Sequence, residues 1–413
     1  MKLTHSAIAL TLACTGAALA ANTGGTAPTY TKDVAPILNK RCVECHREGE
    51  AGPMKFQSYT QVRPWAKAIK QATLTRTMPP WHADPAINHF SNDRRLTDDE
   101  VATITKWVDS GAPEGNTADL PKAPEFVTGW KIGKPDFVID TGTDFHIPSD
   151  GVIKYQYYLV DPGFKEDKWV SAIEVRPVQR SQVHHILVFV VDQGQRVTRA
   201  GEMFSDMLIG YAPGVPSITW PADTGFLIKA GSKLRFQVHY TTNGKEAMDR
   251  SVLGLKFLDK APKYQAFSTS AMQPRIKIPP GDANYEARAT FTFPEDVTLV
   301  DLTPHMHLRG KAFKYTLTYP DGRSEVLLNV PHYDFNWQLS YILAEPRKIP
   351  AGSKIEAVAW YDNSPNNKYN PDPTKTVTWG EQTFEEMMIG FFNYTVPVGA
   401  PPPTPVKGQS AGN

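Results

Sequence analysis

The sequence predicts a mixed fold, in which a small all-α domain is followed by two antiparallel, jelly-roll-like β-sandwiches. Amphipathic helical patterns occupy the first part of the chain, and short alternating segments separated by turn residues occupy the second. The second part covers about 260 residues, which is long for one sandwich, so it is interpreted as two that pack together. We therefore expect a helical domain, a linker, two sandwiches and a proline-rich disordered tail, at residues 21–118, 119–134, 135–268, 269–397 and 398–413.

Residues 1–20 have the pattern of a secretory signal peptide. Lys2 supplies a positive charge, an apolar core follows, and residues 18–20 form an Ala-Leu-Ala cleavage site. A lipoprotein signal ending at Cys14 fits less well, because Thr11 stands where such signals have an aliphatic residue. No later run is long enough to span a bilayer. We therefore expect an exported chain, periplasmic or secreted, with no membrane partner.

The charge and cysteine content exclude two classes of protein. The net charge of +1 provides no basic field, so we expect no nucleic-acid partner. Cleavage of the signal would leave two cysteines, Cys42 and Cys45, which are too few for a disulfide framework in a chain of this size.

These two cysteines stand in the sequence KRCVECHREG, which contains the pattern C-x-x-C-H. Two thiols at this spacing can add to the vinyl groups of haem while His46 binds the iron. A zinc site would need further ligands, and a redox dithiol would need a thioredoxin-like frame; a structural disulfide is the other alternative. The motif favours a covalently bound haem c.

Helical patterns surround this motif. The amphipathic segment YTKDVAPILNKRC precedes it, and LTDDEVATITKWVDSGAP follows, with Thr97 as the expected N-cap. The arrangement resembles a small class I cytochrome c, which implies a methionine as the sixth iron ligand. Met78, on a proline-rich loop, is the candidate, and Met54 and His82 are the alternatives.

The β region carries its histidines in three settings, which are His184 with His185, His239, and His305 with His307. An H-x-H pattern in a strand places both rings on one face, close enough to chelate one metal ion. Adjacent histidines point to opposite faces unless a twist or a bulge brings them together. Taken alone, His239 in the strand KLRFQVHYTT would be a surface histidine, since polar strand faces also carry histidines without a metal.

Four segments taken together resemble a known family. VHHILVF, IGYAPG with the following KLRFQVHY, HMHLRGK and TFEEMMIGFFNY occur in the order found in the copper hydroxylases peptidylglycine α-hydroxylating monooxygenase and dopamine β-monooxygenase. The resemblance covers nearly all of residues 140–396. It implies two copper ions: an electron-storing copper held by His184, His185 and His239, and an oxygen-binding copper held by His305, His307 and Met387.

The assignment of Met387 follows from the resemblance, because this methionine comes after Glu385-Glu386 as the family's ligand follows its acidic residue. Met388 is the alternative, and two methionines in a core strand would need no metal at all. A soft thioether would favour Cu(I), the state that captures O₂.

The resemblance also implies the reaction, which inserts one oxygen atom of O₂ into a C–H bond of a small organic substrate and consumes two electrons. The relatives take these electrons from ascorbate, and the haem of residues 21–118 would replace or relay such an external donor. Thr303 stands where the peptide-amidating relative has the arginine that holds the substrate carboxylate. Because Ile389 and Phe391 also replace polar pocket residues, a peptide ending in glycine is not the expected substrate.

Two other classes remain compatible with these patterns. The chain could be a non-catalytic copper and haem electron-transfer protein, which would not consume O₂ catalytically. It could also be a structural zinc protein, although a methionine ligand argues against zinc. Oxygen uptake distinguishes the first of these from a monooxygenase, and metal analysis distinguishes the second.

Overall fold

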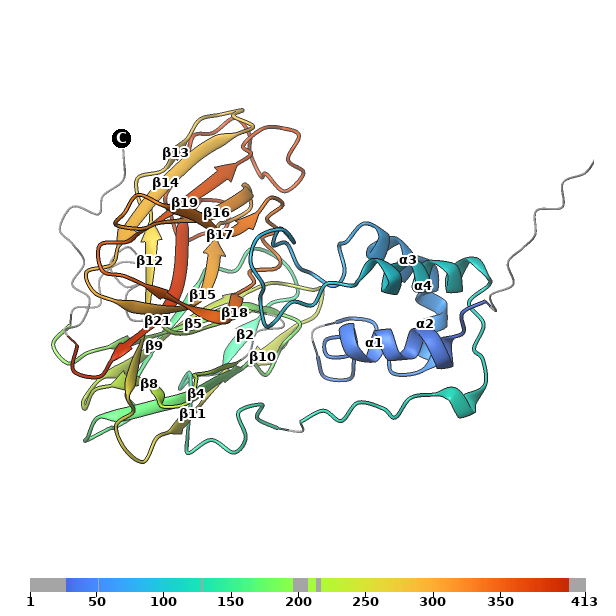
Figure 1. Ribbon diagram of the computed structural model, residues 1–413, viewed down its shortest axis with the longest axis horizontal. Coiled ribbons are helices and arrows are strands. Elements are labelled where there is room, and N and C mark those ends of the chain that lie inside the picture. The colour runs from blue at the N-terminus through green and yellow to red at the C-terminus, as the bar shows by residue number, and fades with distance from the viewer. Residues whose placement is uncertain (1–26, 51, 128, 196–206, 213–216, 401–413) are drawn as a thin grey trace, which may run out of the picture.

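The computed structural model describes residues 27–50, 52–127, 129–195, 207–212 and 217–400. The chain is mostly β-sheet with a small helical region at its N-terminal end, and this part of the predicted fold class is confirmed (Figure 1). The expected signal peptide and residues 401–413 of the expected tail lie outside the described residues. No helix in the described part of the chain combines the length and the apolar character needed to cross a membrane.

The helical region consists of short helices around one apolar core. Thr97 caps helix α4 as predicted: its side chain accepts from the N–H of Glu100, whose carboxylate accepts from the N–H of Thr97. Ile104 and Trp107 on α4 pack with Leu38 in this core. The helices are η1 (Tyr30–Val34), α1 (Ala35–Arg41), α2 (Tyr59–Val62), η2 (Arg63–Trp65), α3 (Ala66–Leu74), α4 (Asp98–Asp109) and η3 (Thr117–Asp119).

Two β-sandwiches follow, and one long sheet is common to both. Among the described residues this shared sheet has nine strands, and β7 pairs with β4 at its side. In order across the sheet the strands are β1 (Phe137–Asp140), β11 (Val252–Phe257), β4 (Lys168–Arg176), β8 (Thr224–Ile228), β12 (Tyr264–Met272), β21 (Ile389–Pro397), β15 (Val297–His305) and β18 (Tyr341–Ile349), with β7 (Ser217–Thr219).

A smaller sheet covers each half of the shared sheet, and an apolar core fills each interface. The first sandwich is closed by β3 (Gln156–Val160), β9 (Lys233–Tyr240), β5 (Val183–Val191) and β6 (Met207–Tyr211), and the second by β14 (Tyr285–Thr292), β19 (Lys354–Tyr361), β16 (Gly310–Thr318) and β17 (Ser324–Val330). Two short pairs are β2 (Phe145–Ile147) with β10 (Ala247–Asp249), and β13 (Lys277–Ile278) with β20 (Val377–Thr378).

The two sandwiches are joined through β12. This strand pairs with β8 of the first sandwich in parallel and with β21 of the second in antiparallel orientation. The sequence predicted purely antiparallel sheets, and this prediction is wrong at one strand pair. The strand that leaves the first sandwich continues its sheet into the second and pairs in parallel with β8. The predicted boundary between residues 268 and 269 falls inside β12.

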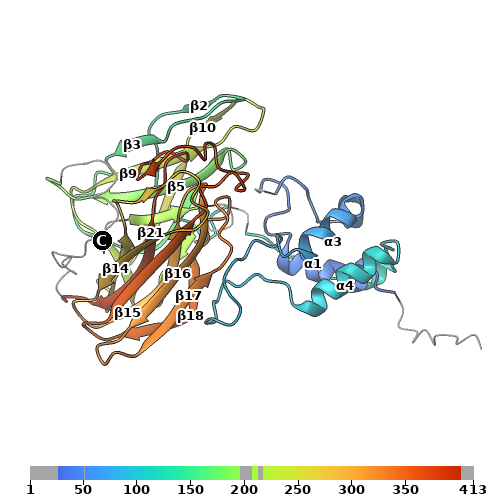
Figure 2. The ribbon, with the colours of Figure 1, turned by 90° about the horizontal axis from the view of Figure 1, so that it is seen from above.

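The helical region is attached to the second sandwich by the loop between α3 and α4, which reaches across to the β region (Figures 1 and 2). Trp81 and Phe90 both pack on Tyr341, with ring centroids 4.9 Å and 5.6 Å apart. Backbone hydrogen bonds connect Ser91 with Ile342 and His89 with Ala344, each at 2.9 Å. Part of the residues expected in the helical domain thus contributes to the core of a sandwich.

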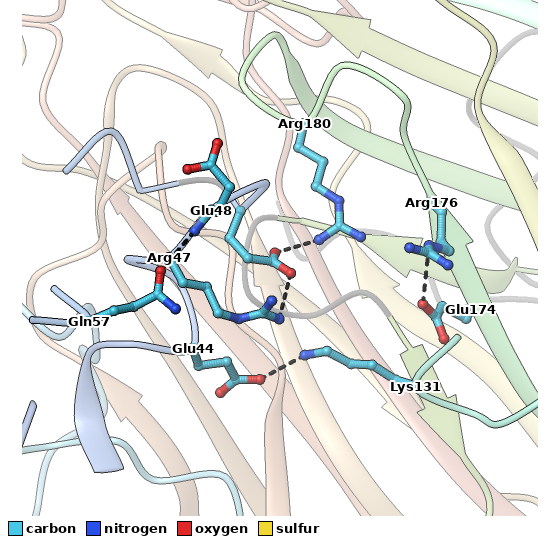
Figure 3. A network of polar contacts seen from close by, with 9 residues as sticks. Glu44, Arg47, Glu48, Gln57, Lys131, Glu174, Arg176 and Arg180 are labelled. Carbon is cyan, nitrogen blue, oxygen red and sulfur yellow. Dashed lines mark hydrogen bonds and ion pairs between the residues drawn. The ribbon is translucent and has the colours of Figure 1, made fainter. Parts of the chain in front are cut away.

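Residues 120–136 contain no helix or strand where they are described, in keeping with the expected linker. The linker nevertheless contacts the first sandwich, because Arg176 lies over the ring of Trp130 and Glu174 accepts from the N–H of Ile132. Lys131 forms an ion pair with Glu44 of the helical region at 2.7 Å (Figure 3). The linker therefore contacts both regions at these residues, although most of its described residues are exposed.

Candidate metal centre

A β-bulge brings His184 and His185 to the same side of the first sandwich. The pairing of β5 with β9 shifts register between Val183 and His185, and His185 then lies directly opposite His239. An extra residue in one strand redirects its side chain, which is how adjacent histidines can converge. The three rings lie with centroids 5.0–5.4 Å apart. The structure therefore has the bulge that the sequence required for a shared site.

The ring nitrogens of these histidines have the arrangement of a metal site. One nitrogen from each ring lies within 4.8 Å of the others. The Nδ1 atoms of His184 and His185 are 3.1 Å apart, near the roughly 3.3 Å expected between two nitrogens bound tetrahedrally to one ion at about 2.0 Å. Nε2 of both rings and Nδ1 of His239 are buried without a hydrogen-bond partner. A cation bound through Nδ1 of His239 would satisfy a polar atom that is otherwise costly to bury.

The second group lies at the end of β15. His305 is the last residue of the strand and His307 follows just beyond it, yet their rings remain adjacent, with centroids 5.2 Å apart. Nδ1 of His305 donates to Oε1 of Gln338 at 2.7 Å, and Nδ1 of His307 donates to the carbonyl of Glu385 at 3.2 Å. Nε2 of His307 is buried and unpartnered. Hydrogen bonds at one nitrogen orient the other toward a metal.

Glu386 fixes the backbone around this pair. Its carboxylate accepts from the N–H groups of His307 and Arg309 at 2.8 Å and 2.7 Å. Burial raises the pKa of Glu386 to about 8, although these two donors act in the opposite direction. The side chain has no solvent exposure, so its role is to hold the turn after His305 in place.

Met387 and Met388 point to different surroundings. Met388 belongs to the core of the second sandwich. Met387 lies in a separate buried cluster with Phe391, whose ring centroid is 6.2 Å from that of His305. His305 is also paired across the sheet with Ile389, two residues after Met387. The placement supports Met387 rather than Met388 as the methionine on the histidine side.

The two histidine groups adjoin each other. The ring centroids of His185 and His305 are 6.2 Å apart. Phe335 lies between the groups: its ring stacks on His184 at 4.6 Å and is 6.2 Å from that of His307. The five imidazoles expected in two triads therefore form one cluster at the junction of the sandwiches.

Burial keeps these imidazoles neutral. It lowers the pKa of His184 and of His305 to about 4 and that of His239 to about 3, and it also lowers the pKa values of His185 and His307. A neutral imidazole is the form that binds a metal ion, so protons compete weakly for these sites near pH 7.

A cavity of about 130 Å³ opens beside the cluster. His185 and His305 line it from the two sandwiches, together with Thr303 and Phe391. Asp301 lies on the same strand face and is buried; both of its carboxylate oxygens accept from Nδ2 of Asn393. No lysine, arginine or histidine in the described part of the chain forms an ion pair with Asp301. A small organic molecule fits a space of this size.

In the helical region the C-x-x-C-H motif follows helix α1. Cys42 and Cys45 are free thiols, and burial raises the pKa of Cys42 to about 12, which argues against a reactive dithiol. Nδ1 of His46 donates to the carbonyl of Met54 at 2.9 Å, and the ring stacks on Phe56. Nε2 is thereby left for a metal, as in a haem ligand.

Met78 lines a second, larger cavity of about 1510 Å³ between the helical region and the second sandwich. His82 and Phe335 line the same space, and so does Arg41, the residue before Cys42. The backbone carbonyl of Met54 is engaged by His46, as described above. Met78 borders this large space, which neither Cys42, Cys45 nor His46 lines, whereas Met54 packs against the helical core.

Sequence reasoning missed several residues of this centre. Phe335, Gln338 and Tyr155 all contact the histidines, Tyr155 with its ring centroid 4.6 Å from that of His239. They lie on loops and carry no periodic signal. His239 itself is buried, not at the surface, because the second sandwich covers the polar face of β9.

Comparison with known proteins gives little similarity. No protein-family model and no curated protein matches the chain. VP2 of infectious bursal disease virus, in its subviral particle, aligns over 68% of this chain and 76% of its own, with 10% identity and a TM-score of 0.20. The major capsid protein P2 of bacteriophage PM2 aligns over 63% and 99%, with 7% identity and a TM-score of 0.27. The function must therefore be inferred from the centre itself.

Proposed function

We propose that this chain is an exported copper-dependent monooxygenase that hydroxylates a C–H bond of a small organic substrate with O₂. The observation that carries the proposal is the convergence of five imidazoles at the junction of the two sandwiches, four of which have a buried ring nitrogen without a hydrogen-bond partner. Copper, when bound, supplies one-electron redox chemistry and a site for O₂.

The two groups of ligands suit different tasks. His184, His185 and His239 offer three imidazoles, a donor set that accommodates both Cu(I) and Cu(II). His305 and His307, with Met387 on their side of the sheet, offer a softer set that favours Cu(I). Gln338 and the Glu385 carbonyl orient the two imidazoles of the second group, and the adjoining cavity holds the substrate next to His305.

The helical region is the electron source in this proposal. Cys42 and Cys45 would carry a haem c, with His46 as one iron ligand and Met78 as the other. The free, partly buried thiols and the His46 hydrogen bond to Met54 support this assignment. An external reductant, either ascorbate-like or a redox protein, would reduce the haem.

Metal analysis tests the proposal directly. The purified full-length chain should contain two coppers and one haem, shown by elemental analysis and a visible c-type spectrum. Adding a reductant should then start catalytic O₂ uptake that a copper chelator stops. Two equivalents of zinc without haem would contradict the proposal, and bound copper and haem without catalytic uptake would indicate an electron-transfer protein instead.

Asp301 lies in the substrate cavity at a cost in stability. Burial raises its pKa from 3.8 to about 6, so the folded chain retains a proton that the unfolded chain has lost between these values. The free energy of unfolding therefore falls as pH rises through this window, by up to about 3 kcal/mol. Asp301→Asn should raise stability at pH 8 by about 1–3 kcal/mol and change it little at pH 4.

Urea denaturation at the two pH values measures this difference. Asp296→Asn, at an exposed aspartate, is the control and should change neither value. Equal stability of Asp301→Asn and the parent at pH 8 would show that the buried carboxylate carries no such cost.

A further inference from the structure

An ion-pair network connects the loop after the haem-binding motif with the first sandwich. The carboxylate of Glu50 accepts from Arg47 at 2.7 Å on its own loop and from Arg180 on the sandwich; Figure 3 draws Glu50 without a label between these two arginines. These side chains are only 17–21% exposed. A charge pair with so little solvent is held more firmly than a surface pair.

One end of this ion pair lies close in sequence to the proposed haem ligand, and the other lies close to the first group of histidines. Glu50 follows His46 by four residues, and Arg180 precedes His184 by four residues. Four extended residues span at most about 14 Å. The ion pair therefore ties the loop that carries the haem ligand to the start of the strand that carries the histidine pair.

Tyr211 lies at the same junction. It pairs with Ile186 across the β5–β6 ladder, next to His185, and it lines the cavity that contains His185 and His305. Burial raises the pKa of its phenol, Arg180 lowers it, and Glu50 and the Cys45 thiol raise it further. Tyr211 thus lies beside the histidine strand, between that strand and the cavity.

We propose that Glu50, Arg180 and Tyr211 form the contact through which the haem on Cys42 and Cys45 passes electrons to the copper held by His184, His185 and His239. The inference rests on the proposed function. Each transfer oxidises one ferrous haem and reduces one cupric ion, so two transfers supply one turnover. An external one-electron donor, such as a small redox protein, re-reduces the haem between transfers.

Flash photoreduction of the haem in the anaerobic, Cu(II)-loaded full chain tests the contact. Haem reoxidation is followed by its visible absorbance, and a rate independent of protein concentration identifies transfer within one molecule. Arg180→Glu places like charges together and should slow reoxidation about tenfold or more, with an unchanged haem spectrum and potential. The double variant Glu50→Lys/Arg180→Glu restores opposite charges and should recover most of the rate.

Two further measurements separate this role from a general loss of structure. Amide hydrogen exchange should quicken in residues 44–50 of Arg180→Glu and return to normal in the double variant, whether or not metals are present. Tyr211→Phe keeps the ring and should transfer at the parent rate, whereas Tyr211→Leu should be slower. Arg323→Glu, at an exposed ion pair with Asp321 in the turn between β16 and β17, is the control and should change neither readout.

The results distinguish failure of this inference from failure of the proposed function. Rapid reoxidation in the parent and an equal rate in Arg180→Glu would overturn the contact alone. A slowed Arg180→Glu that the double variant does not rescue would also overturn it. A parent chain that binds haem and copper but never reoxidises the haem would overturn the electron supply, and a chain without copper would overturn the function as a whole.

Discussion

His307→Ala should lower reductant-dependent O₂ uptake by more than about 100-fold, because the change removes a proposed metal ligand and not merely an outer partner of one. The ring is fully buried, its Nδ1 is fixed by the Glu385 carbonyl, and its Nε2 has no partner within the protein. The variant should retain one copper, held by the first group, and its haem spectrum should be unchanged. Oxygen electrode traces and elemental analysis measure both quantities.

His146→Ala is the matched control, because His146 lies exposed on β2 with a ring nitrogen 3.4 Å from the Glu246 carboxylate. It should keep two coppers and the parent rate. Gln338→Leu should have an intermediate effect of about 10–100-fold, since Gln338 only orients His305. Two bound coppers and normal uptake in His307→Ala would remove this histidine from the centre.

Glu386→Ala should lower the free energy of unfolding by about 2–5 kcal/mol. The change leaves the N–H groups of His307 and Arg309 buried without acceptors, and each such donor costs about 1–3 kcal/mol. Glu386→Gln should lower the free energy of unfolding by less than Glu386→Ala does, because its amide keeps one of the two acceptor oxygens. Denaturant unfolding measures the loss, and copper content should fall in parallel as the turn after His305 loosens.

Glu385→Ala serves as the comparison at the neighbouring position. The Glu385 carboxylate accepts from the N–H of Gln382 at a partly exposed site, while the contact to His307 uses its backbone carbonyl. This variant should lose no more than about 1 kcal/mol. A loss as large as that of Glu386→Ala would mean that the segment as a whole, and not the buried carboxylate, supports the turn.

Local features of the fold could be predicted from the sequence where one strong pattern governs them. Thr97 with Glu100 predicts the start of α4 through a capping box, and the Pro320-Asp321-Gly322 turn predicts the hairpin of β16 and β17. The requirement for a bulge at His184 also follows from the two-residue period of a strand. Each of these depends on neighbours within a few residues.

Features that depend on distant packing could not be predicted. The adjacency of His185 and His305 depends on a sheet that continues from one sandwich into the other, which no local pattern indicates. The attachment of Trp81 and Phe90 to Tyr341 depends on contacts some 250 positions apart in a segment without periodicity. The same reason explains why Phe335 was missed and why the pattern of its own strand, taken alone, would leave His239 at the surface.

The parallel pairing of β8 with β12 has a consequence for how small molecules reach the histidines. Main-chain bonds run unbroken from the half of the molecule that bears His185 to the half that bears His305. A hinge motion that separated the two halves would have to break these backbone hydrogen bonds. Entry of a small molecule therefore depends on local movements of loops and side chains around the cavity. The turnover rate should therefore change little with solvent viscosity and strongly with the size of the substrate.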